Sequence, residues 1–169
     1  MSATVKRIAL FLGVVLAGCS YSPNPNPVSS HTGTIAIPVF QNRTTQPALE
    51  EEVTTAIVNR IIQGSKLRVV PEGEADLVVK GAVVAYKNAV FGFNATEKAE
   101  EYQVAVSLAI TVRDRTKNRE LWRDDQLIRT ANYFVVQVGS QPPQTEDEGR
   151  ASAVDKLAEA VLNKTVETW

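Results

Sequence analysis

The sequence of 169 residues contains one cysteine and one histidine. The single cysteine, Cys19, cannot form a disulfide within the chain or build a cysteine-rich zinc site. The single histidine, His31, excludes the metal motifs that need two histidines, and we predict no metal site. The formal net charge is only −1, so nucleic acid is not an expected partner.

The sequence also lacks an apolar run long enough to cross a bilayer as a helix. The run over residues 8–16 would rise only about 15 Å, roughly half of a hydrocarbon core. Lys6 and Arg7 precede this run, and small residues separate it from Cys19. This pattern is typical of a cleaved export signal, which we place at residues 1–18.

Residues 16–19, Leu-Ala-Gly-Cys, resemble the lipobox of bacterial lipoproteins. The resemblance implies that Cys19 receives covalent lipid, with acyl chains such as palmitate, and becomes the new N-terminus. Each buried methylene contributes about 0.8 kcal/mol, so several chains would form a lasting membrane anchor. Ser20, which is not acidic, follows the cysteine, and in such lipoproteins this favours the outer membrane. The alternative is a secretory signal with a chance cysteine near its cleavage site.

Residues 19–33 are rich in serine, proline and asparagine and have almost nothing to bury. We interpret them as a lipidated tether, which could span roughly 40 Å if extended. His31 lies in this tether, where nothing would hold it as a catalytic base. The folded domain is expected over residues 34–169.

Patterns of catalysis are scarce in the expected domain. No glycine-rich loop that could cradle a phosphate follows the first predicted strand. Nucleophilic catalysis needs a serine, threonine or cysteine beside a positioned base, and the one histidine lies in the tether. The sequence therefore predicts a binding or assembly protein without a cofactor, and not an enzyme.

The first half of the domain predicts a strand, a helix and a second strand. Residues 34–40 alternate between faces, apolar residues repeat at helical spacing over residues 49–61, and Gly64 follows as a stop signal. Residues 67–70 form a short second strand. Three elements within about forty residues favour a right-handed parallel crossover.

The second half predicts a meander of strands followed by a helix. A β-rich run covers residues 75–86, and residues 101–113 alternate apolar with small or polar side chains. A turn at residues 114–118 leads into a strand that continues to about Val138. A capping box of Thr145 and Glu148 then opens an amphipathic helix. The expected fold class is α+β, a two-layer α/β sandwich with two helices packed on one face of a mixed four- to five-stranded sheet.

Five cations gather around the predicted hairpin turn. Spacing places Arg113 and Arg115 on one face, and Arg119 and Arg123 together on the opposite face. Arginine gives bidentate contacts to phosphate, so such a cluster could hold phosphate groups. The alternative is a solvated tip that discourages edge-to-edge aggregation. The candidate residues for this binding are Arg113, Arg115, Lys117, Arg119 and Arg123.

The order of these motifs resembles the LptE family of lipoproteins. The resemblance rests on blocks over residues 35–44, 67–70, 75–81 and 102–122 and on the C-terminal amphipathic helix. It implies a lipid-anchored protein of the cell outer membrane that partners the β-barrel LptD. The domain would face the periplasm or the barrel lumen and assist lipopolysaccharide assembly, with direct lipopolysaccharide contact through basic residues.

A second resemblance is looser. The segment Pro-Val-Phe-Gln-Asn-Arg-Thr at residues 38–44 also occurs in envelope lipoproteins that activate peptidoglycan synthases and in curli-type secretion lipoproteins. The alternative function is therefore the regulation of a peptidoglycan synthase or a part in a secretion pore. The short second strand and the long hairpin favour the LptE family.

Overall fold

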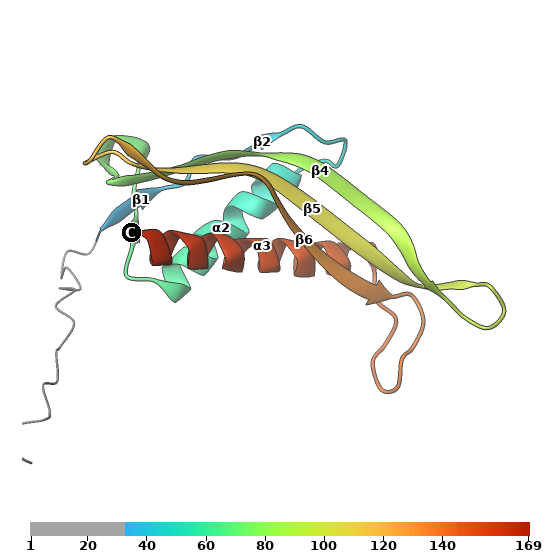
Figure 1. Cartoon of the computed structure of the whole chain (residues 1–169). Helices are drawn as coiled ribbons and strands as arrows, with labels where there is room; N and C mark the ends of the chain where they lie inside the picture. Colours follow the sequence, from blue (N-terminus) through green and yellow to red (C-terminus); the bar gives the residue numbers. More distant parts are fainter. Residues whose placement is uncertain (1–32) are drawn as a thin grey trace, which may run out of the picture. The chain divides into compact units, whose positions relative to one another are not determined.

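The structure of the protein is a computed structural model that describes residues 33–169 (Figure 1). The predicted signal, Cys19, His31 and most of the predicted tether lie outside the described residues. In chain order the elements are β1 (Thr34–Ala36), β2 (Gln41–Asn42), α2 (Leu49–Gly64), β3 (Arg68–Val69), the 3-10 turn η2 (Glu72–Glu74), β4 (Leu77–Phe93), β5 (Ala99–Asp114), β6 (Arg119–Phe134) and α3 (Glu146–Thr168).

The strands form one mixed six-stranded sheet, and both helices cover the same face of it (Figure 1). The strand order is β3-β1-β4-β5-β6, and β2 pairs with β4 beside this path. β1 is parallel to β3 and β4, whereas β5 is antiparallel to both of its neighbours, β4 and β6. This arrangement confirms the α+β class and the predicted two-layer sandwich.

The predicted crossover is confirmed, because β1, α2 and β3 follow one another and the two strands pair in parallel. The first strand is shorter than predicted and ends at Ala36, so Val39 is 66% exposed. Pro38 has no N–H to donate to a ladder, and the N–H of Phe40 donates to the Thr54 hydroxyl of α2 instead. Pairing resumes only at β2, alongside β4.

β1 has hydrogen-bonded neighbours on both sides. The Arg68 N–H donates to the Gly33 carbonyl at 3.0 Å, and the Asp76 N–H donates to the Thr34 carbonyl at 3.1 Å. Gly33 itself is buried beneath the last residue of the chain: a Cβ there would lie 1.8 Å from the Trp169 ring. The domain therefore begins at a strand inside the sheet and not at a free edge.

The long antiparallel strands follow their side-chain pattern. Alternate residues of β5 from Val104 to Val112 are buried against the helices, as predicted. β4 continues to Phe93, seven residues beyond the predicted end at Tyr86, and β6 ends at Phe134 before the predicted limit of Val138. The three strands consequently run on past the N-terminal ends of the helices (Figure 1).

The two helices pack closely on each other at their C-terminal halves. α2 ends at Gly64 as predicted, but the glycine serves packing, because a Cβ there would lie 2.4 Å from Leu162 of α3. α3 begins with the predicted capping box, in which the Thr145 hydroxyl accepts from the Glu148 N–H and the Glu148 carboxylate accepts from the Thr145 N–H. The acidic first turns of both helices suit the positive end of a helix dipole.

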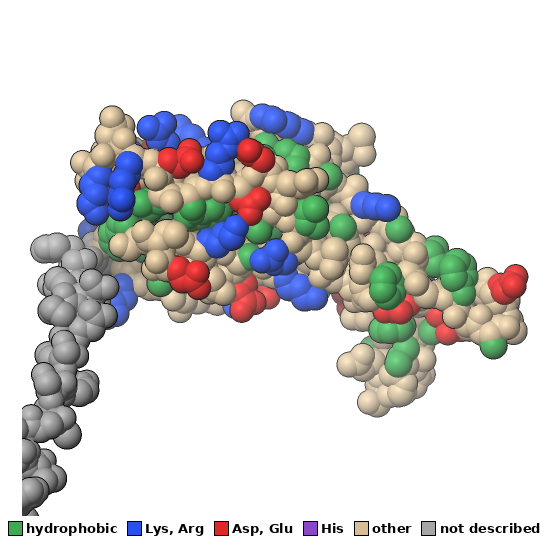
Figure 2. Space-filling view, in the orientation of Figure 1, with side chains coloured by type: hydrophobic (Ala, Val, Ile, Leu, Met, Phe, Trp, Pro, Cys, Tyr) green, Lys and Arg blue, Asp and Glu red, His purple; other side chains and the backbone are tan. Residues whose placement is uncertain are grey.

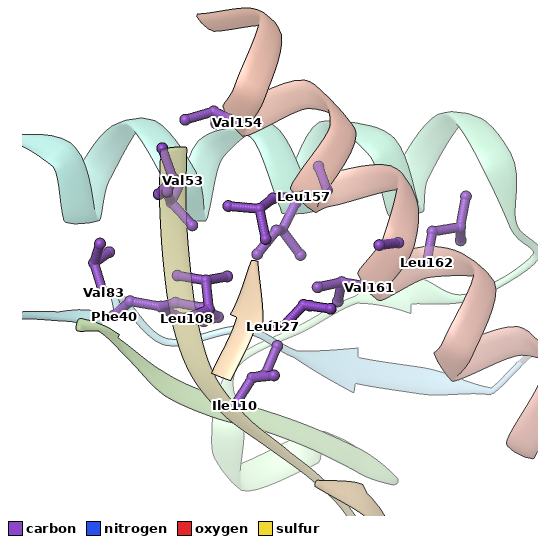
Figure 3. Close-up of a cluster of buried hydrophobic side chains, with 14 of the residues drawn as sticks. Phe40, Val53, Val83, Leu108, Ile110, Leu127, Val154, Leu157, Val161 and Leu162 are labelled. Atoms are coloured by element: carbon purple, nitrogen blue, oxygen red, sulfur yellow. The ribbon is translucent and has the colours of Figure 1, made fainter. Parts of the chain in front are cut away.

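One continuous core lies between the helices and the sheet (Figure 3). Leu157 of α3 is fully buried, together with Val53 of α2 and Leu108 of β5. The labelled side chains converge from five elements and from the Phe40 segment: Phe40, Val53, Val83, Leu108, Ile110, Leu127, Val154, Leu157, Val161 and Leu162. Apolar burial at this layer is the main force that holds the helices on the sheet.

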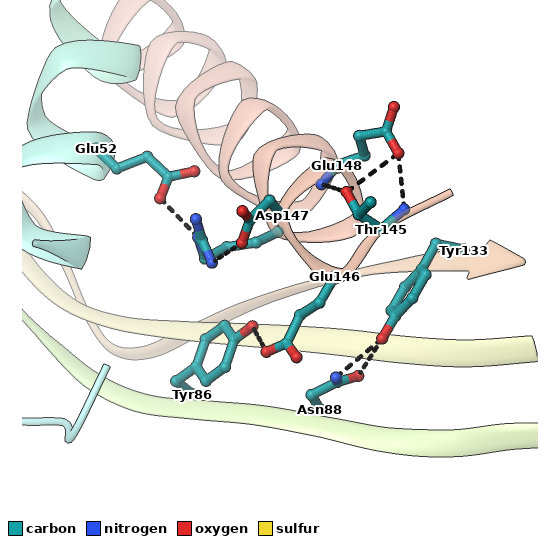
Figure 4. Close-up of polar contacts among 9 residues, drawn as sticks. Glu52, Tyr86, Asn88, Tyr133, Thr145, Glu146, Asp147 and Glu148 are labelled. Atoms are coloured by element: carbon teal, nitrogen blue, oxygen red, sulfur yellow. Dashed lines mark hydrogen bonds and ion pairs between the residues drawn. The ribbon is translucent and has the colours of Figure 1, made fainter. Parts of the chain in front are cut away.

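A polar cluster joins the N-terminal ends of the helices to the sheet (Figure 4). Arg150 of α3 lies 2.8 Å from both Glu52 of α2 and Asp147. Burial alone would lower the pKa of Arg150, but the two carboxylates raise it above its ordinary value. The Tyr86 hydroxyl donates to Glu146 at 2.6 Å, and burial with this carboxylate raises the pKa of Tyr86. This cluster marks where helix coverage of the sheet ends.

Candidate functional site

The β5–β6 turn, which carries the predicted cation cluster, is organised by Asp114. Its side chain is 1% exposed, and one carboxylate oxygen accepts from the Thr116 hydroxyl at 2.6 Å and from the Lys117 N–H at 2.9 Å. Asn118 adopts a left-handed conformation with φ of 48°, which asparagine tolerates better than most residues. The predicted turn is confirmed, with an aspartate as its central acceptor.

Opposing effects act on the Asp114 carboxyl. Burial alone would raise its pKa, but the hydrogen bonds from Thr116 and Lys117 and the Lys117 charge outweigh burial and lower the pKa below its ordinary value. A carboxylate with a lowered folded-state pKa stabilises the fold at pH values above the unfolded-state pKa of about 4. That stabilisation disappears as the pH falls through the folded-state pKa.

Replacing Asp114 with asparagine should therefore lower the free energy of unfolding at pH 7 by about 1 kcal/mol. The difference between wild type and variant should shrink as the pH falls from 5 towards 3. Urea unfolding at a series of pH values measures this directly. Glu159 is an exposed helix residue that forms no ion pair within residues 33–169, so Glu159→Gln is the control, and a pH-independent loss in Asp114→Asn would contradict the role of its charge.

Three of the five candidate cations are held by nearby groups. The Arg115 guanidinium donates to the backbone carbonyls of Glu72 and Ala75, which ties the turn to η2. The Lys117 ammonium lies 3.6 Å from Asp114, and the Arg123 guanidinium lies 2.7 Å from Asp125. Arg115 in particular has a structural role, because its hydrogen bonds hold the turn against the backbone of η2 and of Ala75, which follows it.

The other two cations, Arg113 and Arg119, form no ion pair within residues 33–169. The predicted grouping of Arg119 with Arg123 on one face is wrong. The register shifts between Val112 and Arg113, so Arg119 pairs with Asp114 on the helix-facing side, whereas Arg123 pairs with Thr111 on the same side as Arg113. Arg113 and Arg123 therefore share the uncovered face of the sheet, and Arg119 lies on the other.

A groove of about 390 Å³ lies beside the turn on the uncovered face. Its charged walls are Lys80 of β4, Arg113 of β5, the turn residues Asp114 and Arg115, and Glu72 of η2; Val78, Thr111 and Asn118 complete the lining. Lys80 lies 2.5 Å from Glu72, and this ion pair neutralises both side chains. Arg113 is consequently the lining cation best placed to meet an anionic group.

Sequence reasoning missed the contributions of Lys80 and Glu72 to this groove. Both lie more than thirty residues before the turn, and only the antiparallel pairing of β4 with β5 brings Lys80 opposite Thr111. Lys80 is the one charged residue from Leu77 to Tyr86, a mostly apolar part of β4, and this lysine was the available signal. We define this lining as the turn groove and take it as the candidate site for an anionic ligand.

Other kinds of site are not apparent in the part of the chain that the structure describes. No group of three or more histidine, cysteine, aspartate or glutamate side chains within residues 33–169 could hold a metal ion. Neither α2 nor α3 combines the length and apolarity needed to span a membrane.

Several solved structures resemble this chain at low sequence identity. A hypothetical protein (CT253) from Chlamydia trachomatis matches with a TM-score of 0.54 and 14% identity, over 80% of this chain and 97% of its own. The rare lipoprotein B of Shewanella oneidensis matches with a TM-score of 0.45 and 12% identity, over 80% of this chain and 98% of its own. At these identities the first match supports the fold alone. No curated protein matches the sequence significantly.

The family match rests on the sequence itself and not on shape. The model of the family described as "LptE: Lipopolysaccharide-assembly" matches residues 32–165, which include every described helix and strand except the last turn of α3. The chain therefore belongs to the LptE family of lipopolysaccharide-assembly proteins.

Proposed function

We propose that this protein is an outer-membrane lipoprotein that partners the LptD β-barrel and assists the assembly of lipopolysaccharide at the outer membrane. Family membership over residues 32–165 carries this proposal. The lipobox resemblance at Cys19 supports the membrane anchor, and Ser20 after it favours the outer membrane. The protein acts by binding and positioning and not by catalysis.

The turn groove is the proposed contact for the phosphate groups of lipopolysaccharide. Arg113 lines it and forms no ion pair among the described residues, so its guanidinium can donate to a phosphate without first leaving a carboxylate. Thr111 adds a hydroxyl to the lining, whereas Asp114 is turned into the fold by its bonds to the turn. Arg119 adds positive charge on the other side of the same turn.

Replacing Arg113 and Arg119 with glutamate should weaken lipopolysaccharide binding roughly tenfold or more, because charge-assisted hydrogen bonds are lost. Arg115 is left in place because its contacts hold the turn. Binding of purified protein to labelled lipopolysaccharide measures the effect. The matched control, Arg43→Glu with Arg68→Glu, makes the same change of charge at exposed arginines that form no ion pair within residues 33–169. Equal losses in both variants would indicate net charge alone, and unchanged binding would indicate a solvated tip.

Affinity purification of the tagged, lipidated chain from outer membranes tests the partnership itself. We expect a large heat-modifiable barrel, identified as LptD by mass spectrometry, in stoichiometric yield. A peptidoglycan synthase in its place, or a ring of the chain alone, would reject the proposal.

A further inference from the structure

The two outer edges of the long antiparallel strands are protected very differently. β6 carries six charged side chains in its 16 residues, whereas the 17 residues of β4 carry only Lys80 and Lys87. α3 also lies close to β6, where the Lys156 ammonium donates to the Thr130 carbonyl. Native sheets use charge and covering elements to prevent unwanted pairing at an edge. The edge of β4 has less of that protection, which there consists of Lys87 and local register shifts.

Part of this edge has no neighbour on its outer side. β1 pairs with β4 only at Val78 and the preceding residue, and β2 pairs with it only as far as Val83. Beyond this point, from Ala85 to Phe93, β5 is the single strand beside β4 within residues 33–169. Figure 1 shows the same stretch running along the margin of the sheet. We call Ala85–Phe93 the β4 edge.

The register shows which backbone groups point outward from the β4 edge. The Val83 carbonyl accepts from the Arg43 N–H on the outer side, so the backbone N–H and C=O of Val83 point away from β5. In an antiparallel ladder, every second residue pair has its backbone groups turned outward in this way. Val83 pairs with Leu108 of β5. The β5 residues at alternate positions from Leu108 pair with Tyr86, Asn88 and Val90. These three residues therefore present outward N–H and C=O groups.

Exposed apolar side chains gather at the same end of the sheet. Val90 is 41% exposed, Phe91 58% and Phe93 66%. With Val135 and Val138 of the following connection, this end holds five of the eleven exposed large hydrophobic side chains of the described domain. Figure 2 shows hydrophobic and acidic side chains together there. Register shifts at Val90, Gly92 and Phe93 bend the strand locally and change where these side chains point.

A lipid surface is a poor occupant for this edge. Unpaired backbone N–H and C=O groups cost several kcal/mol each in hydrocarbon. The nearby β4–β5 turn and the start of β5 add Glu97, Glu100 and Glu101 against one cation, Lys98, which repels anionic headgroups. A protein strand, in contrast, satisfies the backbone groups and covers the apolar side chains together.

We propose that the β4 edge is a docking site at which an extended segment of the barrel partner adds a strand to the sheet. The identity of the partner rests on the function proposed above; the strand addition rests on the edge itself. A closed barrel wall has no free edge, so the added strand belongs to a loop or terminal segment of that protein. The occupant offers apolar side chains at alternate positions and basic groups towards the glutamates.

Two variants of the tagged, lipidated chain, coexpressed with LptD of the same organism, test this inference. Phe91→Lys with Phe93→Lys adds the charges that normally guard an edge, and Val90→Pro removes one outward N–H while sparing the ladder with β5. Val39→Lys with Ile62→Lys is the matched control, because these side chains are 66% and 57% exposed. Circular dichroism verifies folding, and photo-crosslinking benzoylphenylalanine at Phe93, which Val90→Pro leaves in place, identifies the neighbour.

We expect both edge variants to reduce the retained barrel at least about tenfold, equal to about 1.4 kcal/mol, and the control to retain it. Wild type and edge variants that retain the barrel equally would overturn strand addition and leave the proposed function standing. If wild type retains no barrel, the proposed function fails, and the crosslink then tests strand addition alone. Crosslinking to an identified protein that disappears in the Val90→Pro variant supports strand addition. A second copy of the chain, a lipid or no crosslink would overturn it.

Discussion

Replacing Leu157 with alanine is expected to lower the free energy of unfolding by about 3 kcal/mol, which corresponds to a urea midpoint lower by roughly 1–3 M. Leu157 is fully buried at the centre of the layer where α3 meets α2 and the sheet (Figure 3). Its loss removes apolar burial and leaves a cavity that three elements cannot readily close. Fluorescence of Trp122, which packs against the core with the Lys164 ammonium 5.4 Å from its ring, reports the transition.

The control for this experiment is Ile62→Ala, on the other helix. Ile62 is 57% exposed, so its truncation should cost less than about 1 kcal/mol. A comparable loss of stability in the two variants would show that α3 does not pack on the sheet as described.

Replacing Cys19 with alanine is expected to abolish lipidation and to leave the uncleaved precursor at the inner membrane. The reason is chemical: without the thiol no diacylglyceryl group can be attached, and acylated chains supply the membrane affinity. Metabolic labelling with a fatty acid and fractionation of the membranes measure both consequences.

Ser20→Ala is the matched control, since it keeps the thiol and introduces no acidic residue after it; it should be lipidated and sorted normally. A Cys19→Ala protein that still carries label and still reaches the outer membrane would reject the lipobox. A Cys19→Ala protein that is cleaved and released would indicate the ordinary secretory signal instead.

Much of the fold follows from local patterns that the sequence carries openly. The alternation over β5 and the capping box of Thr145 and Glu148 each specify one element without help from distant residues. The end of β1 was missed for two reasons. Pro38 has no backbone N–H to donate to a neighbouring strand, and the N–H of Phe40 donates to the Thr54 hydroxyl in α2 instead of to a strand. Such a contact between separate elements leaves no periodic signal.

The candidate site was predictable only in part. The cations around the β5–β6 turn are close in sequence, but the bulge that separates Arg119 from Arg123 depends on pairing between strands. Likewise the sequence alone suggests that Arg115 is a free cation, whereas in the structure its guanidinium donates to the Glu72 carbonyl of η2. The extension of β4 to Phe93 was missed because Asn88 and Gly92 interrupt its alternation, and with it the exposed edge escaped notice.

The placement of β1 has a mechanical consequence for a chain anchored through Cys19. Any pull from a lipidated N-terminus would enter the domain at Gly33, directly before β1. Because β1 bonds to β3 and β4 at once, such a load would shear two ladders together and could not peel one strand from an edge. A strand of only three residues would thus join the domain to such an anchor more firmly than its length suggests.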